Sequence, residues 1–311
     1  MTEIVPHTPV LLNEVIEGLD IKSSGIYLDL TLGRGGHSLE IVKRLDTGLL
    51  IAFDQDEEAI TYSTARLSAY ADRCKIVSTN FVNIDEILSK LGIDKVDGIL
   101  MDLGVSSPQL DESERGFSYR YDAPLDMRMD NHSNPLTAKV IVNTYSLEEL
   151  TRIFKEYGDE KYAYSIAKNI VKAREKKEIL TTFELVDIIK RSKPMKELKK
   201  SGHPAKQAFQ ALRIAVNDEL NVLEETIHKA LKHLNHNGRL AIITFHSGED
   251  KIVKKIFKEY AVVEGNRYDV PLKPEESEYV LVNRKVITAS NEELQINHRA
   301  ESAKLRIIMR K

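Results

Sequence analysis

Apolar runs alternate with helix-like stretches over the first hundred residues, and this alternation is the strongest constraint on the fold. The apolar runs lie at residues 26–32, 49–53, 74–78 and 96–103. Helix-like stretches separate them near residues 37–45, 56–71 and 83–91. Strands and helices in this order predict βαβ units and a parallel sheet. Later strand-like runs lie at residues 239–245, 279–288 and 305–311. We therefore predict a seven-stranded, mostly parallel sheet, with its last two strands antiparallel to each other.

The middle of the chain has a different pattern, because residues 146–236 show helical periodicity and no strand signal. Two capping-box patterns open apolar-periodic segments there, Ser146 with Glu149 and Thr181 with Glu184. These signals predict a helical region within an α/β protein.

The position of this helical region predicts two domains. One long helix is expected to begin near Pro204 and to end before Gly238. We expect residues 1–110 and 212–311 to form the α/β core. Residues 111–211 would form a mainly helical domain inserted between the fourth and fifth strands.

The composition indicates an ordinary soluble protein, with 42% hydrophobic and 30% charged residues. Cys74 is the only cysteine, which excludes an intramolecular disulfide and suits a reducing cytoplasm. The segment MTEIVPHTPV lacks a signal-peptide pattern, and no apolar run approaches the ~20 residues of a membrane span. We expect a cytoplasmic protein without a membrane partner and without a metal, since no residues have metal-ligand spacing.

Basic residues cluster in KRSKPMKELKKSGHPAK, residues 190–206, although the net charge of the chain is −3. This stretch contains seven Lys or Arg residues and one acid, Glu197. Two interpretations are equally open: a solvated loop, or a surface that faces phosphates and gains by counterion release. In the second interpretation Lys196, Lys199 and Lys200 contact nucleic acid.

The segment DLTLGRGGHS, residues 29–38, places a glycine cluster directly after the first strand. Glycine is needed where the backbone turns sharply or approaches a ligand closely. Gly33 and Gly35 fit the first two positions of the dinucleotide pattern G-x-G-x-x-G, but Ser38 takes the third. The missing glycine disfavours a dehydrogenase. It favours a ligand that brings a carboxylate to the helix N-terminus, as S-adenosylmethionine does.

Acidic residues end the second and fourth strands. Asp54 is placed to accept hydrogen bonds from ribose hydroxyls, and Asp56 to cap the next helix. Asp102 ends the fourth strand, so it should share a crevice with Asp54. Ser106 and Ser107 follow in a polar turn, which is either only a turn or a set of acceptors that orients an exocyclic base amine.

The next stretch, ERGFSYRYDAPLDMRMD at residues 114–130, interleaves aromatic residues with arginines. Aromatic and guanidinium planes stack on unpaired bases, and arginines contact phosphates. Core packing is the alternative for the aromatic residues. The interleaving favours a substrate loop in which Arg115, Phe117 and Arg128 contact RNA.

Several segments together resemble one known family. They are HTPVLLNEV (7–15), DLTLGRGGHS (29–38), DGILMDLGVSSPQLDESERGFSYRYDAPLDMRMD (97–130), HPAKQAFQALRIAVNDEL (203–220) and FHSGEDKIVK (245–254). They resemble, in this order, the bacterial 16S ribosomal RNA (cytosine-N4)-methyltransferase family, also called RsmH or MraW. The resemblance covers nearly the whole chain, and DLGVSSPQLD with ERGFS and PLDMRMD is its most specific part.

The resemblance implies a class I (Rossmann-like) methyltransferase core with an inserted helical domain, S-adenosylmethionine as the methyl donor, and 16S rRNA or the small ribosomal subunit as the partner. The cofactor contacts that it implies fall on Gly35, Gly36, His37, Asp54, Phe81, Asp102 and Gln109. Departures from the family pattern occur at Leu30, Gln207, Gly248, His298 and Glu301.

We expect direct transfer of the methyl group to the N4 amine of one cytosine, with alignment as the main task of the site. Asp102, Ser106 and Ser107 are the candidates for orienting the amine, and His246 is a further candidate in the crevice. Cys74 lies in an apolar run without a nucleophile motif, which disfavours methylation at carbon 5.

Two other functions stay open at this point. One is a methyltransferase of another amine, on DNA or protein. The other is a non-catalytic rRNA-binding or assembly factor that keeps the fold. A dehydrogenase is a distant third.

Overall fold

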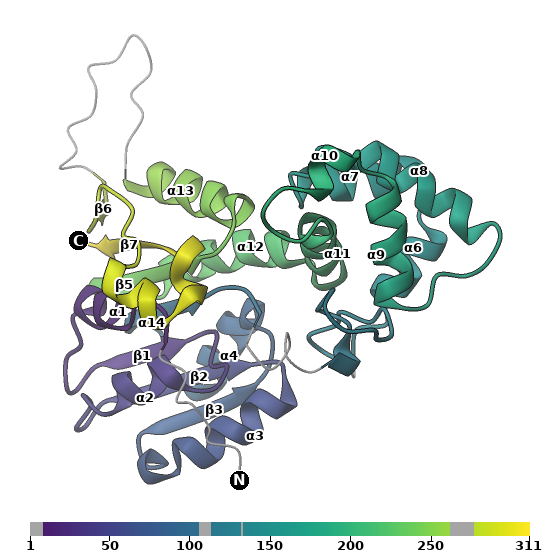
Figure 1. Ribbon diagram of the computed structural model, residues 1–311. Helices are drawn as coiled ribbons and strands as arrows, with labels where there is room; N and C mark the ends of the chain where they lie inside the picture. The colour runs from purple at the N-terminus through teal and green to yellow at the C-terminus, as the bar shows by residue number, and fades with distance from the viewer. Residues whose placement is uncertain (1–8, 106–112, 132, 262–276) are drawn as a thin grey trace. The chain divides into compact units, whose positions relative to one another are not determined.

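A computed structural model describes residues 9–105, 113–131, 133–261 and 277–311. The chain forms two compact units (Figure 1). The first unit combines Met1–Gly104 with Leu220–Lys311, and the second is Val105–Glu219. The boundaries differ from the expected 111 and 211, because a cut after residue 211 would divide the helix Lys206–Asn217.

The first unit contains a seven-stranded sheet of the order β3-β2-β1-β4-β5-β7-β6. The strands are β1 (Ile26–Asp29), β2 (Leu49–Asp54), β3 (Cys74–Ser78), β4 (Val96–Asp102), β5 (Leu234–Thr244), β6 (Tyr279–Leu281) and β7 (Lys304–Arg310). The pairs from β3 to β5 are parallel. Strand β7 is antiparallel to both β5 and β6. The predicted seven-stranded, mostly parallel sheet is confirmed.

Helices cover both faces of this sheet because successive side chains of a strand point to opposite faces. In β2, Leu50 and Ala52 pack with α1 (Leu12–Leu19) and α2 (Gly36–Val42). Ile51 and Phe53 face the other core. That core includes residues of α4 (Ile84–Leu91), α12 (Glu219–Lys232) and α13 (Ser247–Ala261). Helices α3 (Glu57–Arg66) and α14 (Asn291–Ile296) complete the unit.

The second unit is helical among its described residues. Its helices are α6 (Ala138–Thr144), α7 (Leu147–Glu156), α8 (Ala163–Arg174), α9 (Thr182–Arg191), α10 (Met195–Leu198) and α11 (Lys206–Asn217). Both predicted capping boxes are present, at the start of α7 and of α9. Helix α6, capped by Thr137, lies before the helical region that the sequence indicated. Within the described ranges, no helix is both long and apolar enough to span a bilayer.

The single long helix expected between Pro204 and Gly238 is wrong. Asp218 has a φ of 50°, in the left-handed region, and it separates α11 from α12. Strand β5 then begins at Leu234, inside the region predicted to lack strands. Residues 235–238 are Asn, His, Asn and Gly, which are typical of a turn, and the pairing of β4 with β5 shifts register at this point.

Candidate active site

Three aspartates end three neighbouring strands of the first unit. Asp29 ends β1, Asp54 ends β2 and Asp102 ends β4. Strand β1 lies between β2 and β4: the chain proceeds from β1 to β2 and β3 on one side and then crosses to β4 on the other side. Open α/β sheets bind ligands at the carboxyl ends of the strands beside such a switch point. The structure therefore brings Asp54 and Asp102 to one edge of the sheet, as the sequence predicted, and adds Asp29.

Asp54 holds the glycine loop with one carboxylate oxygen and the start of α3 with the other. The N–H of Gly33 donates to Oδ2 at 2.8 Å, and the N–H of Asp56 donates to Oδ1 at 2.9 Å. Burial raises the pKa of Asp54 to about 6, against the opposing effect of the hydrogen bonds from Asp56 and Gly33. Asp56 caps α3 as expected, because its side chain accepts from the N–H of Glu58. The acid after β2 therefore positions the loop before any ligand binds.

The loop needs its glycines. Gly33 and Gly35 have φ values of 49° and 68°, which side-chain-bearing residues rarely adopt. A Cβ atom added to Gly36 would lie 2.5 Å from Cγ of Pro9. The Oγ of Ser63 donates to the carbonyl of Gly33 at 2.7 Å and fixes the turn from the α3 side.

Ser38, in place of the third glycine of the dinucleotide pattern, donates from Oγ to Oδ2 of Asp29 at 2.6 Å. Both residues are buried. Thr31 donates to Oδ1 of Asp29 from its N–H, at 3.1 Å, and from its hydroxyl. The Thr31 hydroxyl oxygen in turn accepts from the N–H of Asp102 at 2.6 Å. Asp29, Thr31 and Ser38 therefore link the ends of β1 and β4. The sequence gave no sign of these contacts.

His37 and Asp102 face each other at this edge. Nε2 of the buried His37 ring lies 3.0 Å from the carbonyl oxygen of Val10, which can only accept, so Nε2 carries a proton. Nδ1 lies 3.6 Å from Oδ2 of Asp102. Burial raises the pKa of Asp102 to about 6, while His37 opposes this shift and Asp29 and Glu249 add to it. Oδ1 of Asp102 is buried and accepts no hydrogen bond from a described residue. This carboxyl group is suited to a ligand that brings a donor or a positive charge.

Phe81 begins a short 3-10 helix (Phe81–Asn83) that follows the end of β3 at Ser78. Its ring packs partly buried against the core that faces α4. The amide of Asn80 donates to Oε1 of Gln55 at 2.9 Å and ties this turn to the end of β2. Phe81 thus follows a turn that is tied to the end of β2, the strand that carries Asp54.

His246 caps helix α13. Its Nδ1 accepts from the N–H of Glu249 at 3.4 Å, while the Glu249 carboxylate accepts from the N–H of His246 at 3.3 Å and from that of Phe245 at 2.7 Å. Such reciprocal bonds are those of a capping box, with histidine in the place of serine. The structure gives His246 a structural task, and a catalytic task stays a prediction.

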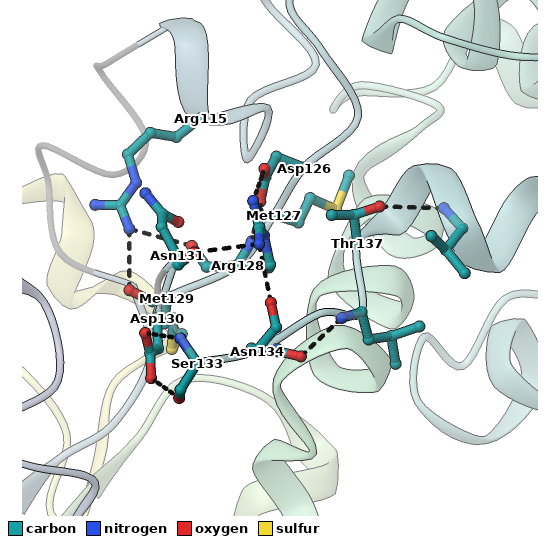
Figure 2. Close-up of polar contacts among 12 residues, drawn as sticks. Arg115, Asp126, Met127, Arg128, Met129, Asp130, Asn131, Ser133, Asn134 and Thr137 are labelled. Carbon is teal, nitrogen blue, oxygen red and sulfur yellow. Dashed lines mark hydrogen bonds and ion pairs between the residues drawn. The ribbon is translucent and has the colours of Figure 1, made fainter.

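The predicted RNA-contacting loop of the second unit is held by its own arginines (Figure 2). The guanidinium of Arg115 donates to the carbonyls of Arg128 and Met129, at 3.1 Å each. Arg128 forms a two-point contact with Asp126, at 2.8 and 2.7 Å, and donates to the carbonyl of Asn134. The packing alternative holds for Phe117, which is buried in the core of the unit. These side chains shape the loop, and their contact with RNA stays a prediction.

The basic stretch is not a loop throughout, because residues 195–198 form α10. Lys196, Lys199 and Lys200 are exposed. Lys200 forms an ion pair with Glu197 at 2.8 Å. Three other predicted site residues, Ser106, Ser107 and Gln109, lie outside the described residues.

The departures from the family pattern have local explanations at two positions. Leu30 is buried in the core that faces α4, and its N–H donates to the carbonyl of Leu100 at 2.9 Å. A Cβ atom on Gly248 would lie 3.1 Å from the ring of His246, so a larger residue there would press on this cap.

Comparison with known proteins gives matches along the whole chain. A model of the MraW methylase family matches residues 4–311. Ribosomal RNA small subunit methyltransferase H of Mesoplasma florum is 53% identical over 308 residues, which are 98% of this chain and 99% of that protein. The protein of the same name from Exiguobacterium sibiricum is 53% identical over 304 residues, 97% of each chain. That from Spiroplasma kunkelii is 52% identical over 310 residues, 98% of each chain.

Proposed function

Because the chain belongs to the MraW methylase family, we propose that it transfers a methyl group to the N4 amine of one cytosine in 16S ribosomal RNA. The protein is a methyltransferase that uses S-adenosylmethionine and acts on small-subunit rRNA. The observation that carries the proposal is the 53% identity with a small-subunit rRNA methyltransferase over 98% of the chain. The position of the methyl group, N4 of cytosine, is inferred from the family resemblance.

The residues at the strand ends fit S-adenosylmethionine. Asp54 already fixes the loop through Gly33, and a carboxylate oxygen can accept a second hydrogen bond, here from a ribose hydroxyl. The buried Oδ1 of Asp102 offers an acceptor without a partner among the described residues. Gly35, Gly36 and His37 would hold the methionine part, and Phe81 the nucleoside part. When bound, the cofactor supplies an electrophilic methyl group on a sulfonium.

The main task of the site in this reaction is to align the N4 amine with the methyl group. The N4 nitrogen forms a bond to the methyl carbon as the bond from that carbon to sulfur breaks, and the amine then loses one proton. Asp102 is suited to orient the amine and to accept this proton, since a general base works best with a pKa near the working pH. Its raised pKa, about 6, meets that condition. Ser106 and Ser107, which follow Asp102 closely in the sequence, stay candidates for further acceptors, and we assign no covalent nucleophile.

The second unit is assigned to rRNA recognition. Its exposed Lys196, Lys199 and Lys200 can neutralise phosphates, and release of counterions then favours binding. We propose a cytoplasmic location on the basis of the rRNA substrate, and a single cysteine agrees with it.

Nucleoside mass spectrometry tests the proposal. Small ribosomal subunits from a strain that lacks the protein are incubated with the purified enzyme and S-adenosylmethionine. We expect one cytidine of 16S rRNA to gain a single methyl group at N4. A methyl group at carbon 5, or on another nucleoside, would contradict the assignment. Cofactor binding without any transfer would favour the assembly-factor alternative.

A further inference from the structure

The second unit presents a stacked pair of rings near its surface. The imidazole of His203 stacks on the ring of Tyr119, with 4.3 Å between the centroids and 4° between the planes. Tyr119 in turn packs edge-on against Phe209, at 5.8 Å, and Phe209 is buried in the core of the unit. Because the ring below it is anchored in the core, His203 is held in one plane.

The hydrogen bond of His203 sets which ring nitrogen is free. The N–H of Ala205 donates to Nδ1 at 3.2 Å, so the proton of the neutral ring is on Nε2. Burial lowers the pKa of His203, and Lys190, Arg120 and Lys193 lower it further. The ring is therefore neutral at pH 7 and presents Nε2–H as a donor. No described residue accepts from this nitrogen.

The cations around His203 differ in how they are compensated. The Nζ of Lys193 is 2.6 Å from Oε2 of the buried Glu160 and 2.7 Å from the carbonyl of Pro204. Lys193 is thus part of the fold. Arg120 and Lys190 are exposed, and neither forms an ion pair with a described residue. A neutral donor flanked by two uncompensated cations is suited to an anion with several acceptor oxygens.

We propose that His203, Arg120 and Lys190 bind one phosphodiester group of the substrate RNA. Nε2–H of His203 donates to a phosphate oxygen, and Arg120 and Lys190 neutralise the charge. Tyr119 is a positioning residue, because it acts through the plane of His203. The inference rests on the proposed function, since it takes rRNA as the ligand. RNA is favoured because the basic stretch continues from Lys190 through Lys200, so that further phosphates of one strand can be bound.

The test measures binding of a 16S rRNA transcript by the full-length protein over a range of salt concentrations. Lys190→Gln should weaken binding and lower the slope of log affinity against log salt concentration by about 1. Lys176→Gln is the matched control, because Lys176 is also exposed and forms no ion pair with a described residue. Lys176 lies beyond the carboxyl end of α8, whereas Glu160 and Lys193 lie near the amino end of this helix. The 12 residues of α8 span about 18 Å, and this length separates Lys176 from Glu160 and Lys193.

A second variant separates the hydrogen bond from the charge. His203→Phe keeps a ring to stack on Tyr119 but loses Nε2–H. It should weaken binding roughly tenfold with an unchanged salt slope, because a hydrogen bond releases no counterion. Arg120→Gln with Lys190→Gln should lower the slope by about 2 without unfolding the unit, since both side chains are exposed.

Three outcomes would be decisive. If the wild type methylates rRNA and the three variants bind as it does, this site is overturned and the proposed function stands. If the wild type binds rRNA with the expected variant pattern but transfers no methyl group, the reaction is overturned and the site stands. If the wild type does not bind the transcript, this site is overturned for free rRNA, and methyl transfer to small subunits decides the proposed function separately.

Discussion

The two units place the charged groups of their candidate ligand sites in opposite environments. At the strand ends of the first unit, carboxylates are buried, and Asp29 and Asp54 accept several hydrogen bonds from loop donors. At the proposed phosphate site of the second unit, Arg120 and Lys190 are exposed and have no ion-pair partners among the described residues. A buried polar group is costly unless its partners are fixed, whereas an exposed charge costs little and acts through salt-dependent attraction. The first arrangement suits alignment of a small cofactor, and the second suits a long polyanion.

Asp102→Ala should give the largest effect, because it removes the buried carboxyl at the switch point. We expect transfer to fall by about 10²–10⁴-fold, the usual contribution of a positioned acid–base group. Single-turnover measurement of methyl transfer to small subunits would show it. Asp102→Asn keeps the shape and separates loss of the base from loss of the contact. Transfer by Asp102→Ala at the wild-type rate would remove Asp102 from the mechanism.

Gly35→Val should block cofactor binding. The φ of Gly35 is 68°, and an added Cβ would lie 3.1 Å from Oγ of Ser63. Gly92→Val is the matched control, since Gly92 has a φ of 66° with nothing within 4 Å of an added Cβ. Both variants carry the backbone strain, which is of order 1–3 kcal/mol. Only Gly35→Val should lose affinity in a calorimetric titration with S-adenosylmethionine. Wild-type affinity there would show that the loop does not hold the cofactor.

Ser38→Ala tests why the third glycine of the dinucleotide pattern is absent. The variant removes a hydrogen bond to the buried Asp29, which should lower the free energy of unfolding by about 1–3 kcal/mol. Burial raises the pKa of Asp29 above its usual value, and the hydrogen bond from Ser38 opposes this shift. Ser38 therefore stabilises the charged form. Its contribution should be full at high pH and decline as pH falls through the pKa of the folded state.

Denaturant unfolding of the wild type and of Ser38→Ala at several pH values measures this contribution. The loss should be larger at pH 8 than at pH 4. An equal loss at both pH values would mean that Ser38 acts only through packing.

Sequence patterns predicted the elements whose signals are local. Apolar runs identified all seven strands, and the capping boxes at Ser146 and Thr181 identified α7 and α9 correctly. The break at Asp218 was missed, because a single left-handed residue leaves the helical periodicity on both sides unchanged. Pairing between distant residues was also missed: Ser38 with Asp29, and His203 with Tyr119, are set by tertiary packing. Arg115 and Arg128 were predicted to contact RNA; the structure adds that their side chains donate hydrogen bonds to their own loop, and contact with RNA stays a prediction.

The smallest effects are expected where charge is exposed and partly compensated, at Lys196, Lys199 and Lys200. Replacing all three with Gln should weaken binding of rRNA and flatten its salt dependence, as release of counterions requires.

The three lysines should not contribute equally to the salt dependence, because Lys200 is paired with Glu197 at 2.8 Å. When Lys200 alone is replaced, Glu197 loses its ion-pair partner Lys200 and repels phosphate. Part of the loss of RNA affinity in that variant is therefore due to Glu197. Lys200→Gln with Glu197→Gln removes this contribution. Its salt slope should then fall by less than the change of about 1 expected for Lys196→Gln alone. Equal slopes for the triple variant and the wild type would make this segment a solvated surface and would confine RNA binding to other residues.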